Sequence, residues 1–225
     1  MPWATRSQRY SRSRRLLLLA VIVEGLLVTV ALVWIQLRGL SVELGALLPG
    51  LITGLAAAGL LAWANYLLLR VAPPVEPVEA IRRLYQEMLQ PLFAKATPVE
   101  IIGISVAAAI GEELLFRGVL QRELGIVVAS VLFGIAHIGG RTSVVFGVWV
   151  MVMGGALGVL VPLTGGVLAS VVAHGVYDVL AISYMRWVKP RRVRNGETLE
   201  AVNGPYAAFP AVAVNSDVSG DEDES

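Results

Sequence analysis

Long apolar stretches constrain the fold of this chain most strongly. They occupy residues 16–37, 42–69, 99–120, 125–138, 144–163 and 165–188. A helix needs about 20 apolar residues to cross a hydrocarbon core of ~30 Å, so only 125–138 is short for a span. Hydrophobic residues make up 56% of the chain and charged residues only 16%, which excludes an ordinary soluble domain. We therefore predict an all-α polytopic transmembrane helix bundle of about six spans.

Charged residues are segregated along the chain. The first fifteen residues contain five Arg and no acid, and residues 186–194 contain four Arg and one Lys. Residues 195–225 contain seven acidic residues and no basic one. Basic residues collect in cytoplasmic loops, and a cytoplasmic N-terminus places fifteen of the eighteen basic residues on that side. We therefore expect both termini to be cytoplasmic.

The domain organisation follows from these boundaries. We expect a basic cytoplasmic tail at 1–14, two transmembrane helices within 15–74, a membrane core at 75–188, and a basic then acidic disordered tail at 189–225. Within the core, apolar residues recur at helical spacing over 75–92. This pattern predicts an amphipathic helix lying in the membrane interface; a connecting helix packed on the bundle is the alternative.

Two absences narrow the chemistry. The chain has no Cys, which excludes disulfides, thiolate metal sites and a cysteine nucleophile. No nucleic-acid motif is present, and we expect no nucleic-acid partner. The partners predicted from the sequence are the lipid bilayer and a membrane-associated peptide or protein.

Several ionisable residues lie inside the predicted spans, where charge is costly and usually functional. They are Glu24, Glu112, Glu113, Arg117, His137, His174 and Asp178, and they include every His of the chain. Glu113 and Arg117 are four residues apart on one helix face and can pair with each other. That pairing leaves Glu112 free to face another helix. His174 and Asp178 share a face in the same way, and so do Phe133 and His137.

A helix rises ~1.5 Å per residue, so we expect Glu112, His137 and His174 to lie at similar depths near the middle of the membrane. A carboxylate in a dry site can accept a proton from water. One His can hold the same water, or both can bind zinc together with Glu112. His174 with Asp178 can stabilise an oxyanion or have its tautomer fixed. These residues favour hydrolysis within the bilayer, and the alternative is that they only hold helices together.

Three short motifs also carry a resemblance. Residues 112–117 read EELLFR, 133–137 read FGIAH and 174–178 read HGVYD. This series resembles the EExxxR, FxxxH and HxxxN/D motifs of the CPBP intramembrane protease family, which contains bacterial Abi proteins and is related to the type II CAAX prenyl endopeptidases. The resemblance covers about residues 77–187.

The resemblance implies an intramembrane endopeptidase of metallo or glutamate type in a bacterial plasma or internal membrane, with a protease-like core at 75–188. Glu112 would activate water, His137 would hold the water or a metal, and His174 and Asp178 would face the substrate carbonyl. Supporting roles fall to Glu113, Arg117 and Phe133. Zinc bound by Glu112, His137 and His174, and CAAX-type processing, are the options left open. The alternative is a non-enzymatic immunity or scaffold protein of the same fold.

Overall fold

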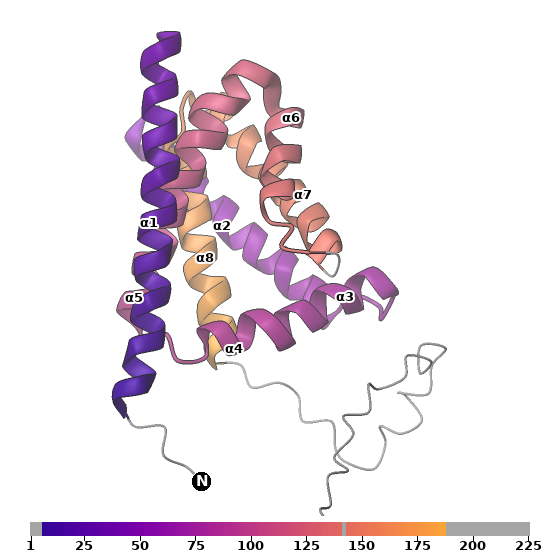
Figure 1. Cartoon of the computed structure of the whole chain (residues 1–225). Coiled ribbons are helices and arrows are strands. Elements are labelled where there is room, and N and C mark those ends of the chain that lie inside the picture. The colour runs from indigo at the N-terminus through magenta and orange to yellow at the C-terminus, as the bar shows by residue number, and fades with distance from the viewer. Residues whose placement is uncertain (1–5, 141–142, 188–225) are drawn as a thin grey trace, which may run out of the picture. The chain divides into compact units, whose positions relative to one another are not determined.

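A computed structural model describes residues 6–140 and 143–187 of the chain. In this part every regular element is helical, which confirms the all-α prediction (Figure 1). In chain order the elements are α1 (Arg6–Arg38), α2 (Leu47–Arg70), α3 (Glu76–Leu84), η1 (Tyr85–Leu89), α4 (Gln90–Phe93), α5 (Pro98–Glu113), η2 (Leu114–Leu120), α6 (Gln121–Ala136), α7 (Val144–Thr164) and α8 (Leu168–Trp187). Both η1 and η2 are π-helical.

Five helical segments of the described residues are long and apolar enough to cross a membrane. They are Arg15–Arg38, Leu47–Arg70, Pro98–Ala136, Val144–Thr164 and Leu168–Trp187. Large apolar side chains such as Leu19, Leu26 and Leu60 are exposed on their outer faces. Such a surface suits lipid and not water, in agreement with the multi-pass prediction.

The prediction of six spans was wrong by one. Residues 99–120 and 125–138 belong to the single segment Pro98–Ala136, which is kinked at Gly125, where φ is 82°. That positive φ favours glycine, because side chains with a Cβ rarely adopt it. From Gly125 to Ala136 the helix rises only about 16 Å, roughly half of a hydrocarbon core. In Figure 1 the chain turns there and α6 comes back beside α7.

The expected interfacial helix corresponds to α3, η1 and α4. Ile81, Leu84 and Tyr85 are buried, and Ile81 and Tyr85 pack in one cluster with Ile182 and Met185 of α8. Arg82 donates hydrogen bonds to the carbonyls of Leu68, Leu69 and Ala72 at the end of α2. These contacts support the alternative of a connecting segment packed on the bundle. A position at the membrane surface stays a prediction.

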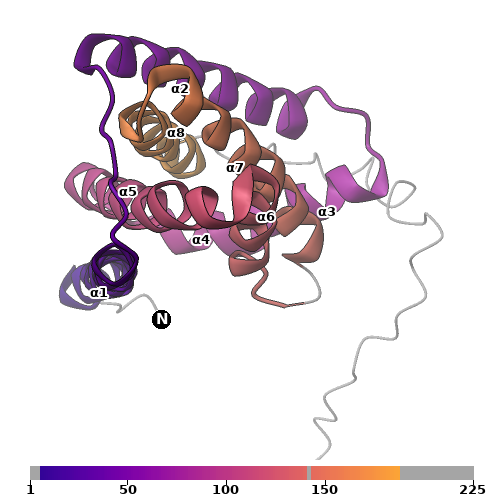
Figure 2. The same cartoon turned by 90° about the horizontal axis from the view of Figure 1, so that it is seen from above.

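The helices of the core pack at short distances where glycines face neighbouring backbone. A Cβ built on Gly54 of α2 would lie 2.8 Å from the carbonyl oxygen of Ala169 on α8, and one on Gly134 of α6 would lie 2.5 Å from that of Gly147 on α7. Seen from above, α2 lies outside α8 and α1 lies beside α5 (Figure 2).

The predicted domain boundaries at 15, 75 and 189 stay predictions. Helix α1 already begins at Arg6, inside the segment expected to be a separate basic tail. The expected tail at 189–225 lies outside the described residues.

Candidate active site

The two glutamates lie at the end of α5, where the chain passes from α-helix into the π-helical η2. Helix α5 begins at a capping box, in which Thr97 and Glu100 bond each other's backbone N–H, followed by Pro98 at its first position. Short π-helical segments are frequent at functional sites, since they change the direction of side chains locally. Glu112 faces a cavity, whereas Glu113 is fully buried.

Glu113 and Arg117 form the ion pair that their spacing predicts. Glu113 Oε2 lies 3.3 Å from Arg117 Nε, and the two side chains are 0% and 1% exposed. Arg117 Nη2 also donates a hydrogen bond of 2.9 Å to the carbonyl of Gly154 on α7, and its guanidinium lies 4.5 Å from the centre of the Phe133 ring. Arg117 therefore ties α6 and α7 to the segment that carries the glutamates.

His137 follows the last residue of α6, and its orientation is set by the turn before it. Its Nδ1 donates a hydrogen bond of 2.8 Å to the carbonyl of Phe133, and its ring packs 4.8 Å from the ring of Phe133. This bond fixes the proton on Nδ1 and leaves the Nε2 lone pair available. Nε2 lies 3.9 Å from Oε1 of Glu112.

His174 extends from α8 and touches three carboxylates. Its Nδ1 donates a hydrogen bond of 2.9 Å to Oε1 of Glu113. Its Nε2 lies 3.8 Å from Oε2 of Glu112 and 3.5 Å from Oδ2 of Asp178, one helical turn later. The shared face predicted for His174 and Asp178 is therefore present.

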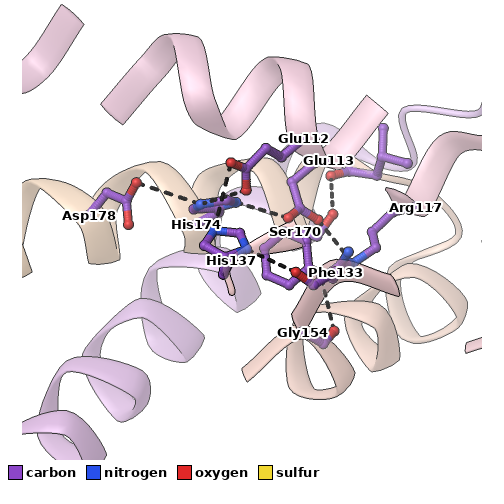
Figure 3. Close-up of polar contacts among 10 residues, drawn as sticks. Glu112, Glu113, Arg117, Phe133, His137, Gly154, Ser170, His174 and Asp178 are labelled. Carbon is purple, nitrogen blue, oxygen red and sulfur yellow. Dashed lines mark hydrogen bonds and ion pairs between the residues drawn. The ribbon is translucent and has the colours of Figure 1, made fainter. Parts of the chain in front are cut away.

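Glu112 thus lies between the Nε2 atoms of both histidines, which come from different helices (Figure 3). Glu112, His137, His174 and Asp178 all line one cavity of about 200 Å³. The rest of its wall is largely apolar and aromatic, with contributions from η1, α4, α7 and α8. The structure therefore brings together the four predicted catalytic residues and the three predicted supporting residues, which are Glu113, Arg117 and Phe133.

The residues of the possible zinc site do not form a ligand cluster in the described part of the chain, and zinc binding stays a prediction. Among the described residues, no group of three or more His, Asp and Glu side chains is arranged to hold a metal ion. Glu112, His137 and His174 approach one another, yet Nε2 of His174 also faces Asp178. Three converging protein ligands are the usual minimum for catalytic zinc.

Sequence reasoning missed two contributors to the site. Gly154 supplies the carbonyl that holds Arg117. Ser170 is fully buried one turn before His174 on α8, and its hydroxyl donates a hydrogen bond of 2.8 Å to the carbonyl of Val167. Ser170 could have been found from the sequence, because it lies four residues before His174 on the same helix face. The role of Gly154 could not, because every residue has a backbone carbonyl.

Glu24 of α1 is also nine-tenths buried in the described structure. Its carboxylate lies against Gly111, where a Cβ would come within 2.5 Å of Glu24 Oε2. That oxygen has no hydrogen-bond partner among the residues described. The absence of a side chain on Gly111 gives Glu24 a packing site next to Glu112.

Comparison with known proteins matches the same part of the chain. Residues 94–180 match the family model described as Rce1-like, type II CAAX prenyl endopeptidase. The uncharacterized protein YpbD of Bacillus subtilis (strain 168) is 29% identical over 110 residues, which are 49% of this chain and 58% of that relative. The chain therefore spans less than two thirds of the relative's length. No solved structure matches it.

The match includes the three motifs and every residue of the proposed site, from Glu112 to Asp178. It confirms the family resemblance predicted from these motifs, over a slightly shorter range than the predicted 77–187. Residues 94–180 of this chain are therefore similar to the Rce1-like type II CAAX prenyl endopeptidase family.

Proposed function

We propose that the protein is an intramembrane endopeptidase that hydrolyses peptide bonds of membrane-associated proteins or peptides. The observation that carries the proposal is the position of Glu112, whose two carboxylate oxygens lie 3.9 and 3.8 Å from the Nε2 atoms of His137 and His174 at a cavity wall. A carboxylate beside an imidazole lone pair can orient and deprotonate one water molecule. The family match supports the same activity.

In the proposed reaction, a water donates one hydrogen bond to Glu112 and the other to the Nε2 lone pair of His137. Glu112 takes a proton as the water oxygen bonds to the carbonyl carbon. The same proton then passes to the amide nitrogen as the C–N bond breaks, which releases a carboxylic acid and an amine, and the proton of the acid then passes to the amine to give a carboxylate and an ammonium group. Because Glu112 is both base and acid, the step needs no other proton carrier.

In this proposal His137 accepts a hydrogen bond from the water, whereas His174 is a donor. As an imidazolium it donates Nδ1–H to Glu113 and presents Nε2–H between Asp178 and the cavity. The positive charge stabilises the oxyanion of the tetrahedral intermediate. Asp178 then acts as the partner of His174 and does not itself face the oxyanion, because an ionised carboxylate there would repel the negative charge.

The apolar cavity wall suits a substrate segment drawn from the membrane. CAAX-type processing is one form of this activity, and an apolar peptide without a prenyl group is another. A bacterial plasma or internal membrane, with both termini cytoplasmic, is the proposed location. Reporter fusions at each end of the chain test that orientation.

The experiment compares cells that express the wild-type chain with cells that express Glu112→Gln. New protein N-termini in the membrane fraction are labelled and identified by mass spectrometry. We expect a set of cleavages in or beside apolar segments that occurs only with the wild type, because Gln keeps the size of Glu but cannot act as a base. Glu43→Gln, at an exposed position, is the matched control and retains cleavage. Identical sets of N-termini for wild type and Glu112→Gln would favour a non-enzymatic binding protein.

A further inference from the structure

A second groove lies between α2 and α8, which pack side by side (Figure 2). It contains a cavity of about 230 Å³. Its walls are formed by Ala62, Asn65, Tyr66 and Leu69 of α2 and by Tyr177, Leu180, Ala181 and Tyr184 of α8. Tyr66 and Leu180 are 50% and 45% exposed, so the groove is open on the lipid-facing surface of the bundle.

Arg70 is fixed at one end of this groove. It is the last residue of α2 and directly follows Leu69 of the groove wall. Its Nε donates a hydrogen bond to the hydroxyl of Tyr184, and its guanidinium lies 5.6 Å from the centre of the Tyr184 ring. Arg70 is nevertheless exposed, and no carboxylate forms an ion pair with it among the residues described. A guanidinium held in this way can bind phosphate oxygens through its outer N–H groups.

The surroundings of Arg70 favour an anion. Arg82 donates hydrogen bonds to the carbonyls of Leu68 and Leu69 in the same turn of α2, and the carboxylate of Glu79 is paired with Arg82. No acidic side chain lines the groove. A phosphate beside Arg70 therefore meets positive charge, whereas an ammonium group in the same headgroup finds no carboxylate in the groove wall.

The depth and lining of the groove suit a phospholipid. Arg70 ends the span Leu47–Arg70, where a membrane helix meets the lipid headgroups. From there the groove extends back to Ala62, eight residues or about 12 Å along α2. The amide of its wall, Asn65, already accepts a hydrogen bond of 3.2 Å from the hydroxyl of Tyr85. The apolar and aromatic groups that remain can pack against an acyl chain.

We propose that the groove between α2 and α8 binds an anionic phospholipid, whose phosphate accepts hydrogen bonds from Arg70 and whose acyl chain lies along the groove toward Ala62. The predicted cytoplasmic position of Arg70 agrees with this ligand, because anionic lipids give the cytoplasmic leaflet its negative potential. Arg70 and Tyr184 lie outside residues 94–180, which match the family model. The bound lipid covers Tyr177 and Ala181, which also line the cavity of Glu112.

Native mass spectrometry of the full-length protein in detergent micelles measures the binding of single lipids. The probe is phosphatidylglycerol, and phosphatidylethanolamine with the same acyl chains is the zwitterionic comparison. We expect the wild type to prefer phosphatidylglycerol, and Arg70→Gln to lower that affinity about fivefold, the worth of one Arg at an anionic headgroup. Arg83→Gln is the matched control, because it removes the same charge from an exposed position outside the groove wall and should leave the affinity unchanged.

A second pair of variants tests the groove without changing the charge. Ala62→Phe fills the groove and should weaken the binding of phosphatidylglycerol, whereas Ala56→Phe adds the same group at an exposed position of α2 and should not. Thermal unfolding in lipid-free micelles shows whether each variant is folded. Where Ala62→Phe does not fold, the comparison of Arg70→Gln with Arg83→Gln decides alone.

Three results would overturn the inference. They are equal affinity of the wild type for the two lipids, equal effects of Arg70→Gln and Arg83→Gln, and equal binding by folded Ala62→Phe and Ala56→Phe. A further titration uses the uncharged peptide N-acetyl-Leu-Leu-Leu-amide. Peptide binding that Ala62→Phe abolishes and Arg70→Gln leaves unchanged, without a preference for phosphatidylglycerol, would assign the groove to a peptide in place of a lipid.

Discussion

His174 donates a hydrogen bond from Nδ1 to Oε1 of Glu113 across 2.9 Å, and both side chains are almost completely buried. The bond joins α8 to the end of α5 and directs Nε2 of His174 toward Glu112. Since Glu113 also pairs with Arg117, it links the histidine to the residue that ties α6 and α7 together. Glu113 is therefore the structural centre of the proposed site, while Glu112 is its proposed reactive group.

Replacing Glu113 by Gln should damage both stability and activity. The change leaves Arg117 buried without a counter-charge, and breaking a buried pair in this way costs about 3–5 kcal/mol. Urea unfolding in micelles measures the loss. Glu123→Gln is the control, because its partner Arg38 is 61% exposed, and it should cost less than about 1 kcal/mol. Similar costs for the two variants would contradict the central position of Glu113.

His137→Ala should reduce the rate of cleavage with little effect on folding. The side chain is 30% exposed, and its Nδ1 donates a hydrogen bond to the carbonyl of Phe133 on the preceding helix. Loss of a group that orients the attacking water lowers the rate by about 10²–10⁴-fold. Initial rates on a substrate found by N-terminal labelling measure the effect. A variant within about threefold of the wild-type rate would show that His137 does not hold the water.

Asp178→Asn tests whether Asp178 serves as a hydrogen-bond acceptor for His174 or whether its negative charge is required. As a hydrogen-bond partner of His174, 3.5 Å away, Asp178 can be replaced by Asn because the amide oxygen also accepts. We expect Asn to keep the rate within about tenfold and Leu to lower it by about 10²-fold or more, as both are measured in the same cleavage assay. Equal losses for Asn and Leu would instead show that the negative charge is required.

Gly54→Ala should destabilise the packing of α2 on α8. The new Cβ would lie 2.7 Å from Cβ of Val172 and 2.8 Å from the carbonyl oxygen of Ala169, so the helices have to move apart. Such overpacking costs about 1–3 kcal/mol. Gly59 lies on the same helix with nothing within 4 Å of its added Cβ, and Gly59→Ala should be neutral or stabilising. Thermal unfolding of the two variants in micelles measures the difference, and equal midpoints would contradict this packing.

The local features of the site could be predicted from the sequence, because they depend on helix geometry alone. The four-residue spacing of Glu113 and Arg117, and of His174 and Asp178, predicts pairs that the structure contains. The scarcity of charge in the apolar stretches drew attention to Glu112 and to both histidines, and these side chains meet at one cavity.

Other features depend on packing between helices and could not be predicted. The sequence predicts a break between residues 120 and 125 and shows that 125–138 is short, but it does not show that the two stretches form one segment kinked at Gly125. The carbonyl of Gly154 becomes an acceptor only because α7 lies beside Arg117. The orientation of His174 toward Glu113 likewise arises only when distant helices are brought together.

Cleavage in water enriched in ¹⁸O tests the central claim most directly. A peptide substrate identified by N-terminal labelling is incubated with the reconstituted wild-type protein and with Glu112→Gln, and the fragments are weighed. Glu112 is proposed to activate water for direct attack. We therefore predict that the wild type forms an N-terminal fragment with one ¹⁸O in its new carboxylate and that Glu112→Gln forms none. Labelled fragments formed equally by both proteins, or fragments without the label, would contradict the account.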